Sequence, residues 1–437
     1  MRLTNQLTAA GVAAACVAGV VAGVAAPAGA ASASGVTIDL PTWWAPTQEI
    51  PPTQALYNNV FTKETGIKVV MQFVPSGDFT TKVTTAAASG NPYPVITADT
   101  NDLTEYARTG LITPLGPFVA KSHFNLNAYL PGVTSQLYYQ GKLYGLTNDQ
   151  GSYYLYYNAN LFKAAGLPLP GPDFTWAQML SDAQKLTTAN HKVWGLDLND
   201  VAGTPDIFAR MNGQDIMNSS GTKFELTNPA TEQAFSFFQS LVYKYHVAPA
   251  YSSTVTGAAE LFADGDVGMM LDGSWEVDYL RYIKPKFSWD IGNLPVGPAA
   301  KGVVHAPIFQ GVYMMSAGLS SQLQTAAWKL IQFYASPVFA NQIMGVKLSS
   351  LPALKEELAD PSAYDLWPAA QPQSLTKSFL TQFLANAQEM PQQGIYLTEQ
   401  TNTDLGTLDE PFSTPIAVGP FLAKVQAKIN ADLGAKS

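Results

Sequence analysis

Two neighbouring tryptophans near the start of the chain are the first side chains that could bind a polar solute. Trp43 and Trp44 follow a short β-rich segment at 36–40, which Pro41 ends, so the pair should lie in a loop. Sugars present apolar CH faces together with hydroxyl groups, and their sites combine aromatic rings with carboxylates and amides. Trp43 and Trp44 are therefore candidate stacking groups, although one of the two should belong to the core.

A cluster of polar side chains follows the apolar run at 95–98. Asp99, Asn101 and Asp102 would leave this strand at its carboxyl end, the edge at which open α/β sheets hold ligands. At least one of them must also cap the helix that begins near Asp102. Asp99 and Asn101 are the preferred ligand contacts, and Asp102 is the better candidate for the cap.

Further polar candidates stand at turns. Asn199 and Asp206 flank the turn at 203–205 and could face a cleft, although exposed Asn and Asp are common in turns. Gln310 stands beside Gly311, where short strands return after a helix-rich region. These three side chains are secondary candidates for contacts with a polar ligand.

Several chemistries find no support in the sequence. The four histidines are scattered without zinc-ligand spacing, and no phosphate loop or nucleophile elbow occurs, so we expect no metal, no cofactor and no catalysis. The formal net charge of −9 and the lack of any basic run argue against nucleic acid as a partner. Cys16 is the single cysteine, which leaves the chain after it without thiol chemistry.

The first 30 residues differ in composition from the rest. One charge at Arg2 precedes an Ala-, Val- and Gly-rich run at 7–26, and small residues follow at 28–30. This layout predicts a cleaved signal peptide over residues 1–30, and the mature protein should be periplasmic or lie at the cell surface. A transmembrane anchor is the alternative, but no cationic stop follows the apolar run. Lipid attachment at Cys16 is disfavoured because apolar residues follow it.

The mature chain alternates β and α patterns at first and then becomes helix-rich. The early alternation predicts a mainly parallel sheet covered by helices, and the later change of pattern predicts a second domain. The expected strands are 36–40, 67–74 and 95–98, with short strands again within 293–312, and the expected helices are 53–65, 79–89, one from about 102, 159–165, 176–188, 229–245, 258–264 and 324–335.

Seven short motifs occur in one order along the chain and resemble a known family. The sequence is similar to extracellular solute-binding protein family 1, the maltose-binding-protein-like components of ABC importers. Val95 departs from the pattern, which usually has Asp there, and the tail at 405–419 is longer and richer in proline. The motifs are 61–69, 94–96, 106–112, 142–146, the stretch 156–158 with Leu161 and Phe162, 262–275, and 294–298 with 311–316.

The resemblance implies an α/β fold of the two-lobed, type II periplasmic-binding-protein kind, in which each lobe is a mainly parallel sheet flanked by helices. It also implies that the ligand lies in the cleft between the lobes and that hinge segments absorb the closing rotation. The implied lobes are 36–149 plus 313–361 and 153–309 plus 367–437, joined by crossings near 149–153, 309–313 and 360–367.

The resemblance adds three site residues and a partner. Trp275 follows the apolar run at 267–271, where the family places a stacking aromatic, and Gln150 aligns with a family contact at the first crossing. Tyr396 stands where the family offers a late aromatic. The implied function is the binding of a small sugar and its delivery to the membrane permease of an ABC importer, by a protein expected to be monomeric.

Two other functions fit parts of the sequence. A secreted glycosidase would need two carboxylates flanking a bond, for which Asp99 with Asp272 or with Glu276 are candidates. A ferric-ion-binding protein would use phenolate oxygens, and the tyrosine pairs at 153–154 and 156–157 could supply them. Neither alternative accounts for the order of the motifs along the chain.

Overall fold

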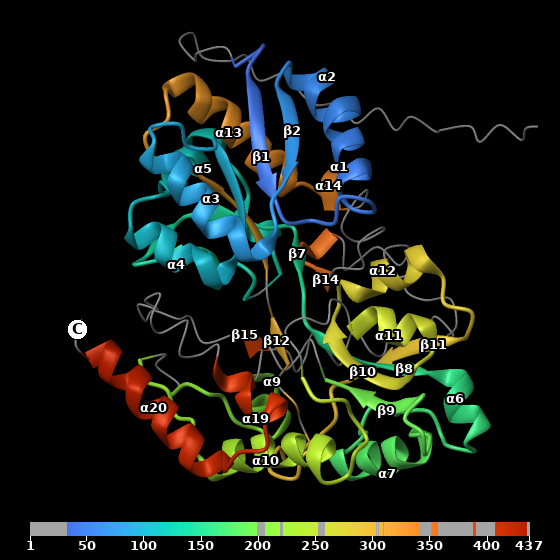
Figure 1. Cartoon of the computed structure of the whole chain (residues 1–437). Coiled ribbons are helices and arrows are strands. Elements are labelled where there is room, and N and C mark those ends of the chain that lie inside the picture. The colour runs from blue at the N-terminus through green and yellow to red at the C-terminus, as the bar shows by residue number, and fades with distance from the viewer. Residues whose placement is uncertain are drawn as a thin grey trace, which may run out of the picture.

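The computed structural model describes residues 33–130, 132–198, 206–218, 222–251, 258–302, 304, 306–308, 310–340, 351–356, 388–389 and 407–434. Within these residues the chain forms two bodies, one above the other in Figure 1. Each body has its own hydrophobic core, and we call the two bodies lobe one and lobe two. The first core draws on residues between 33 and 146 and between 312 and 354, and the second on residues between 153 and 308 and between 408 and 429.

Lobe one consists of short strands with helices around them. Strands β1 and β2 pair in parallel, and β13 runs antiparallel to both β3 and β6. The main elements are β1 (Thr37–Thr42), α1 (Ile50–Leu56), a π-helical turn (Tyr57–Phe61), α2 (Thr62–Thr65), β2 (Lys68–Phe73), α3 (Ser76–Ala88), β3 (Val95–Asp99), α4 (Thr100–Arg108), α5 (Gly116–Ser122), β4 (Tyr138–Tyr139), β5 (Lys142–Leu143), β6 (Gly145–Leu146), β13 (Gly311–Met315), α13 (Ser321–Tyr334) and α14 (Pro337–Phe339).

Lobe two contains a four-stranded sheet in the order β11, β8, β10, β9. Strand β10 is parallel to β9 and antiparallel to β8. The elements are β8 (Tyr153–Asn158), α6 (Ala159–Ala164), α7 (Trp176–Leu186), β9 (Trp194–Asp197), α9 (Asp206–Met211), α10 (Pro229–Tyr243), α11 (Ala258–Asp264), β10 (Val267–Gly273), α12 (Glu276–Ile283), β11 (Trp289–Gly292), β12 (Pro307–Ile308), β15 (Gln388–Glu389), α19 (Glu410–Ser413) and α20 (Val418–Gly434).

The strand directions are more mixed than the alternating sequence pattern alone predicts. Parallel pairing holds for β1 with β2 and for β9 with β10, but β8 and β13 run against their neighbours. These two strands are the ones with which the chain enters each lobe from the other. A strand that arrives from the opposite lobe starts at the edge where the local β-α-β strands end, so it lies antiparallel to them.

The helix predicted at 53–65 illustrates how local sequence sets the elements. The helical segment runs from Ile50 to Thr65 and includes the π-helical turn. It starts earlier than predicted because Pro51 and Pro52 fit the first turn, where a backbone donor is not needed. It ends at Gly66, whose φ of 72° is a left-handed conformation that glycine adopts without a steric cost.

Within the described residues, the chain passes between the cores at two short segments, one at 147–152 and one that includes residues 310–311. In the first, β7 (Asp149–Gln150) pairs with β14 (Leu351–Pro352). The third predicted crossing, at 360–367, lies outside the described residues, as does the predicted signal peptide. The exact lobe boundaries therefore remain predictions.

The C-terminal end of α13 contacts both connecting segments. The side-chain amide of Asn148 donates to the carbonyl oxygen of Tyr334 at 2.7 Å, and the hydroxyl of Tyr334 donates to the carbonyl oxygen of Gly311 at 3.2 Å. The Tyr334 ring also stacks on Tyr313, with 3.6 Å between ring centroids. Tyr334 thus binds both of these connecting segments. Among the described residues, no helix is both long and apolar enough to cross a membrane.

Candidate functional site

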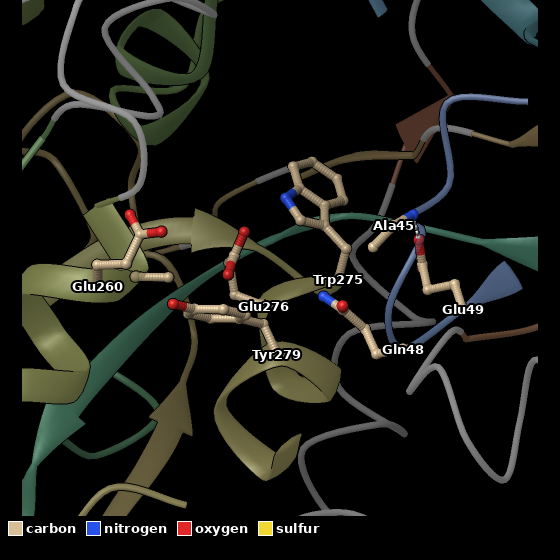
Figure 2. Close-up of a pocket in the computed structure, with 8 residues that line it drawn as sticks. Ala45, Gln48, Glu49, Glu260, Trp275, Glu276 and Tyr279 are labelled. Carbon is tan, nitrogen blue, oxygen red and sulfur yellow. Dashed lines mark hydrogen bonds between the residues drawn. The ribbon is translucent and has the colours of Figure 1, made fainter. Parts of the chain in front are cut away.

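A pocket of about 200 Å³ lies between the two lobes. Figure 2 shows its side chains gathered around one space. Lobe one contributes the segment that joins β1 to α1, and lobe two contributes α11 and the start of α12. The lining residues are Ala45, Gln48 and Glu49 from lobe one, and Ala259, Glu260, Trp275, Glu276 and Tyr279 from lobe two.

Trp275 is the principal aromatic group of this pocket. Its side chain is 40% exposed, which is unusual for tryptophan, and it makes an edge contact with Tyr153 at 5.3 Å between ring centroids. The ring lies close over the end of β10, because a Cβ atom at Gly273 would come within 2.1 Å of it. It also lies beside the first connecting segment, at Gly151. The ring is therefore held in place while part of its surface faces solvent.

Three glutamates line the pocket together with this ring. The Glu49 carboxylate accepts a hydrogen bond from the backbone nitrogen of Ala45 at 2.5 Å, which fixes it at the start of α1. The Tyr279 hydroxyl is hydrogen-bonded to the Glu260 carboxylate. Burial, followed by the charges of Glu260 and Glu276, raises the pKa of Tyr279, so its phenol stays protonated and donates. An exposed aromatic ring with carboxylate acceptors nearby can hold a ligand that has apolar CH faces and hydroxyl groups.

The two early tryptophans belong to the packing of lobe one. Trp44 is buried and packs near Phe339, with 6.5 Å between ring centroids. Trp43 is half-buried and meets Phe79 edge-on at 4.9 Å. Both contact the first hydrophobic core, and neither is among the residues that line the pocket.

The polar cluster after β3 lies at the second connecting segment. Asp99 ends β3 and pairs with Gly311, and the backbone nitrogen of Thr100 donates to the carbonyl oxygen of Gln310 at 3.1 Å. The Asp102 carboxylate accepts from the backbone nitrogen of Asp99, so Asp102 caps α4. Burial raises the pKa of Asp102 to about 6. Asn101 belongs to α4, but its side chain lies outside what the structure describes.

The two glutamines at the connecting segments are both buried. Gln150 lies in β7, opposite Leu351. The Gln310 amide nitrogen donates to the carbonyl oxygen of Val133 at 2.9 Å, while its side-chain oxygen is buried and accepts no hydrogen bond from the described residues. The structure thus brings Gln310 together with Asp99, and Gln150 close to Trp275, since Gly151 lies next to that ring.

Asp206 lies inside lobe two rather than at the pocket. It begins α9, and its carboxylate lies 3.5 Å from Nε of Arg210, which also pairs with Asp215. Burial raises the pKa of Asp206 to about 6 in spite of the charge of Arg210. Asn199 and Tyr396 lie outside the described residues.

The sequence does not predict most of the pocket wall. It indicates Glu276 only as a catalytic partner for Asp99, and it does not mark Gln48, Glu49, Glu260 or Tyr279 as site residues. A signal for two of them existed, because Glu276 and Tyr279 stand one and four positions after Trp275. The spacing of three places their side chains on one face of α12. The lobe-one side of the pocket carried no such signal, because its contact with Trp275 depends on how the lobes meet.

The chain belongs to the family of bacterial extracellular solute-binding proteins, whose family model matches residues 35–340. Among curated relatives, a binding protein of Brucella abortus (strain 2308), BAB2_0491, is 24% identical over 276 residues. The alignment covers 61% of this chain and 64% of that relative, so about a third of the relative is unmatched.

Two solved structures of the same fold have bound ligands. UgpB from Mycobacterium tuberculosis in complex with glycerophosphocholine gives a TM-score of 0.80 at 19% identity, over 92% of this chain and 99% of that one. Maltose-bound MalE3 of T. maritima gives a TM-score of 0.78 at 20% identity, over 91% and 100% of the two chains. At these identities the likeness establishes the fold, which is the two-lobed type II periplasmic-binding-protein fold.

Proposed function

We propose that this protein is the solute-binding component of an ABC importer and that it captures a sugar in the cleft between its lobes. The observation that carries the proposal is the interlobe pocket, in which the exposed ring of Trp275 stands among carboxylates from both lobes. The family supports a binding role, and the relatives include a maltotriose-binding protein of Pyrococcus abyssi. The pocket volume is below the roughly 300–1,000 Å³ of drug-sized sites, so it suits one sugar ring at a time.

In this proposal the pocket residues make different kinds of contact with the sugar. Trp275 stacks on a sugar face, and Glu49, Glu260 and Glu276 accept hydrogen bonds from hydroxyl groups. Asp99, Asn101, Gln150 and Gln310 lie at the connecting segments and are the further contacts we propose for a ligand that reaches toward the hinge.

Closure of the lobes completes the proposed cycle. A ligand that touches both lobes favours the state in which they approach, and the permease of the importer would recognise that state. The proposed lobes are 36–149 plus 313–361 and 153–309 plus 367–437. We propose that the protein acts outside the cytoplasmic membrane as a monomer, after removal of residues 1–30, with neither catalysis nor a nucleic-acid partner.

A thermal-shift screen of mono- and oligosaccharides tests the proposal, because a ligand of the folded state raises the melting temperature by mass action. With a sugar in hand, Trp275→Ala should weaken binding several-fold, since an aromatic contact of this kind contributes about 1 kcal/mol. Tyr282 is 57% exposed on the same helix but does not line the pocket, so Tyr282→Ala is the matched control. Unchanged affinity in folded Trp275→Ala would remove the ring from the site.

Local geometry argues against Asp272 as a catalytic carboxylate and against Tyr154 and Tyr156 as iron ligands. For a glycosidase, Asp272 is a poor catalytic carboxylate because it is buried in β10 and accepts a hydrogen bond from the backbone nitrogen of Gly273 at 2.6 Å. For iron binding, Tyr156 donates to the carbonyl oxygen of Gly273 at 2.5 Å. Burial raises the pKa of Tyr154 well above its usual range, which disfavours the phenolate that iron requires. Chromogenic glycosides and the colour of added ferric iron provide direct tests.

A further inference from the structure

The charged residues that line the interlobe pocket are all acidic. Three of its lining residues are glutamates, and none of the lining residues within the described part of the chain is Lys, Arg or His. The glutamates come from both lobes: Glu49 from the start of α1, Glu260 from α11 and Glu276 from α12 (Figure 2). Closure of the lobes would bring these charges nearer to a bound solute and to each other.

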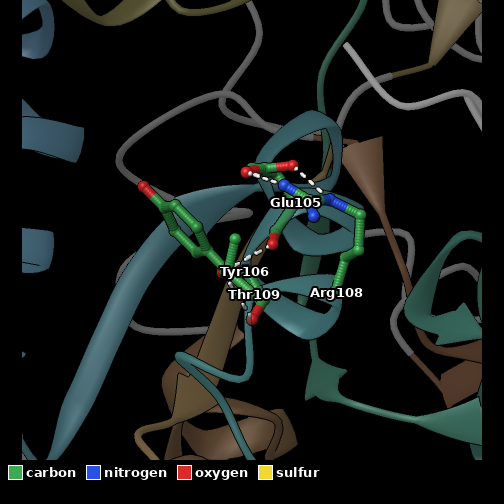
Figure 3. A network of polar contacts seen from close by, with 4 residues as sticks. All are labelled: Glu105, Tyr106, Arg108 and Thr109. Carbon is green, nitrogen blue, oxygen red and sulfur yellow. Dashed lines mark hydrogen bonds and ion pairs between the residues drawn. The ribbon is translucent and has the colours of Figure 1, made fainter. Parts of the chain in front are cut away.

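Arg2 lies in the first 30 residues, and the other arginines of the chain are Arg108, Arg210 and Arg281. None of these three lines the pocket. Arg108 binds both carboxylate oxygens of Glu105, at 2.9 and 2.7 Å, at the end of α4 (Figure 3). Arg210 is buried in lobe two with Asp206 and Asp215. No guanidinium from these two residues can therefore make the paired hydrogen bonds that phosphate groups favour.

Arg281 is the remaining arginine, and it lies on α12, the helix that supplies Glu276 and Tyr279 to the pocket. It stands two positions after Tyr279, and residues two apart on a helix point about 200° apart. Since Tyr279 faces the pocket, Arg281 faces away from it. The helix therefore presents its carboxylate and phenol to the cleft and its basic group to the other side.

The charged side chains that line this pocket within the described residues are all carboxylates, and these would repel a phosphate group. Like charges placed together across an interface discriminate strongly against the wrong partner, and repulsion is greatest where water is excluded. A cation meets the opposite situation, because carboxylates attract it and the exposed face of Trp275 can interact with it through its ring electrons. A neutral polyol is held by hydrogen bonds to the same carboxylates.

We propose that the cleft accepts uncharged or amine-bearing polyols and rejects phosphorylated ones. This inference rests on the proposed sugar-binding function and narrows it. The discrimination is relevant to this family, because the relatives include both a maltotriose-binding protein and sn-glycerol-3-phosphate-binding proteins. The carboxylates of both lobes act together as the selectivity element.

Calorimetry on the full secreted chain with matched sugar series tests the inference. The probes are glucose, glucosamine and glucose 6-phosphate, the corresponding galactose and mannose compounds, and trehalose beside trehalose 6-phosphate. In each series that binds, the amine should bind at least as tightly as the parent, and the phosphate at least about 100-fold more weakly. Glu276→Gln should reduce the ratio of affinities between the parent sugar and its phosphorylated form roughly tenfold, since the substitution removes one repulsive charge. Glu64, which is exposed on α2 far from the pocket, supplies the control Glu64→Gln.

The outcomes separate this inference from the function on which it rests. A phosphate that binds within tenfold of its parent, or an amine that binds tenfold more weakly, overturns the charge selectivity while sugar binding stands. An unchanged gap in Glu276→Gln shows that the pocket carboxylates are not its source and also overturns the inference. Absence of binding by the whole panel and by the oligosaccharide screen contradicts the sugar-binding function itself, and this inference with it.

Discussion

Lobe one and lobe two bury different kinds of polar group. All of the charged side chains that are buried within the described residues lie in lobe two: Asp182, Asp197, Asp206, Arg210, Asp272 and Asp290. Lobe one relies on neutral pairs, such as the hydroxyls of Tyr57 and Tyr313, which lie 2.7 Å apart. Asp102, the acid of lobe one with a raised pKa, is only half-buried.

This difference predicts that the two lobes respond differently to pH. Burial raises the pKa of Asp290 to about 7 and that of Asp206 to about 6, whereas an unfolded chain would leave both near the ordinary aspartate value. Between pH 4 and 7 the folded lobe two therefore holds protons that the unfolded chain releases. The free energy of unfolding of lobe two should fall as pH rises through this range, and that of lobe one should change less.

Arg210→Ala in lobe two should cause the largest loss of local stability. The substitution leaves Asp206 and Asp215 without their cation, and breaking a buried ion pair in this way costs about 3–5 kcal/mol. Because a two-lobed protein has no single free energy of unfolding, local hydrogen exchange is the suitable measurement. Protection should be lost in α9 and α10 and retained in lobe one.

Arg108→Ala in lobe one is the control for that experiment. Its side chain is 27% exposed and its partner Glu105 is 40% exposed, so this pair contributes only about 0–1 kcal/mol. Equal losses of protection in the two variants would mean that burial of the ion pair is not what distinguishes the lobes.

An intermediate effect is expected for Asp290→Asn in lobe two. The amide keeps an oxygen that accepts from the backbone nitrogen of Ile291, at 2.8 Å in the native protein, and it removes the titrating group. The variant should match the native protein near pH 4 and be more stable above pH 7 by about 4 kcal/mol, since the folded and unfolded pKa values of Asp290 differ by about three units and each unit corresponds to about 1.4 kcal/mol. Thermal unfolding from pH 4 to 8 measures the gap.

The exposed Asp173, in the same lobe, supplies the matched substitution Asp173→Asn, which should leave the pH profile unchanged. A stability gap for Asp290→Asn that stays constant between pH 4 and 8 would show that the carboxyl of Asp290 does not titrate differently in the folded and unfolded states.

Tyr57→Phe in lobe one should cause the smallest loss of stability. The variant loses a buried hydrogen bond between neutral hydroxyls, which costs about 1 kcal/mol. Burial raises the pKa of Tyr57 well above its usual range, so the cost should not vary between pH 5 and 9. Hydrogen exchange in α1 at both pH values measures it. A cost that grows with pH would remove the proposed contrast between the lobes.

Much of the fold could be predicted from the sequence because local signals agree with the final structure. The helix at 258–264 was predicted with the bounds that the structure has, and Gly66 ends its helix as expected. The sequence also placed Trp275 after a buried strand. These features depend on residues within a few positions of each other, which is the range over which periodicity and capping act.

The rest depends on contacts between distant segments. Nothing near Asp290 distinguishes it from exposed aspartates such as Asp173, because its burial comes from the packing of β11 against β8. Glu49 and Glu276 meet one pocket only because the lobes face each other. The direction of β8 and β13 likewise follows from the path of the chain between lobes.

The contact of Tyr334 with both connecting segments has a mechanical consequence. Asn148 and Gly311 are bound to the same residue, so backbone rotation in one segment strains the hydrogen bond held by the other. The two segments should therefore twist together, and the relative position of the lobes would be described by a single angle about the line that joins them. Such coupling removes sideways sliding as a soft degree of freedom, and closure should then proceed as one concerted relaxation with a single rate constant.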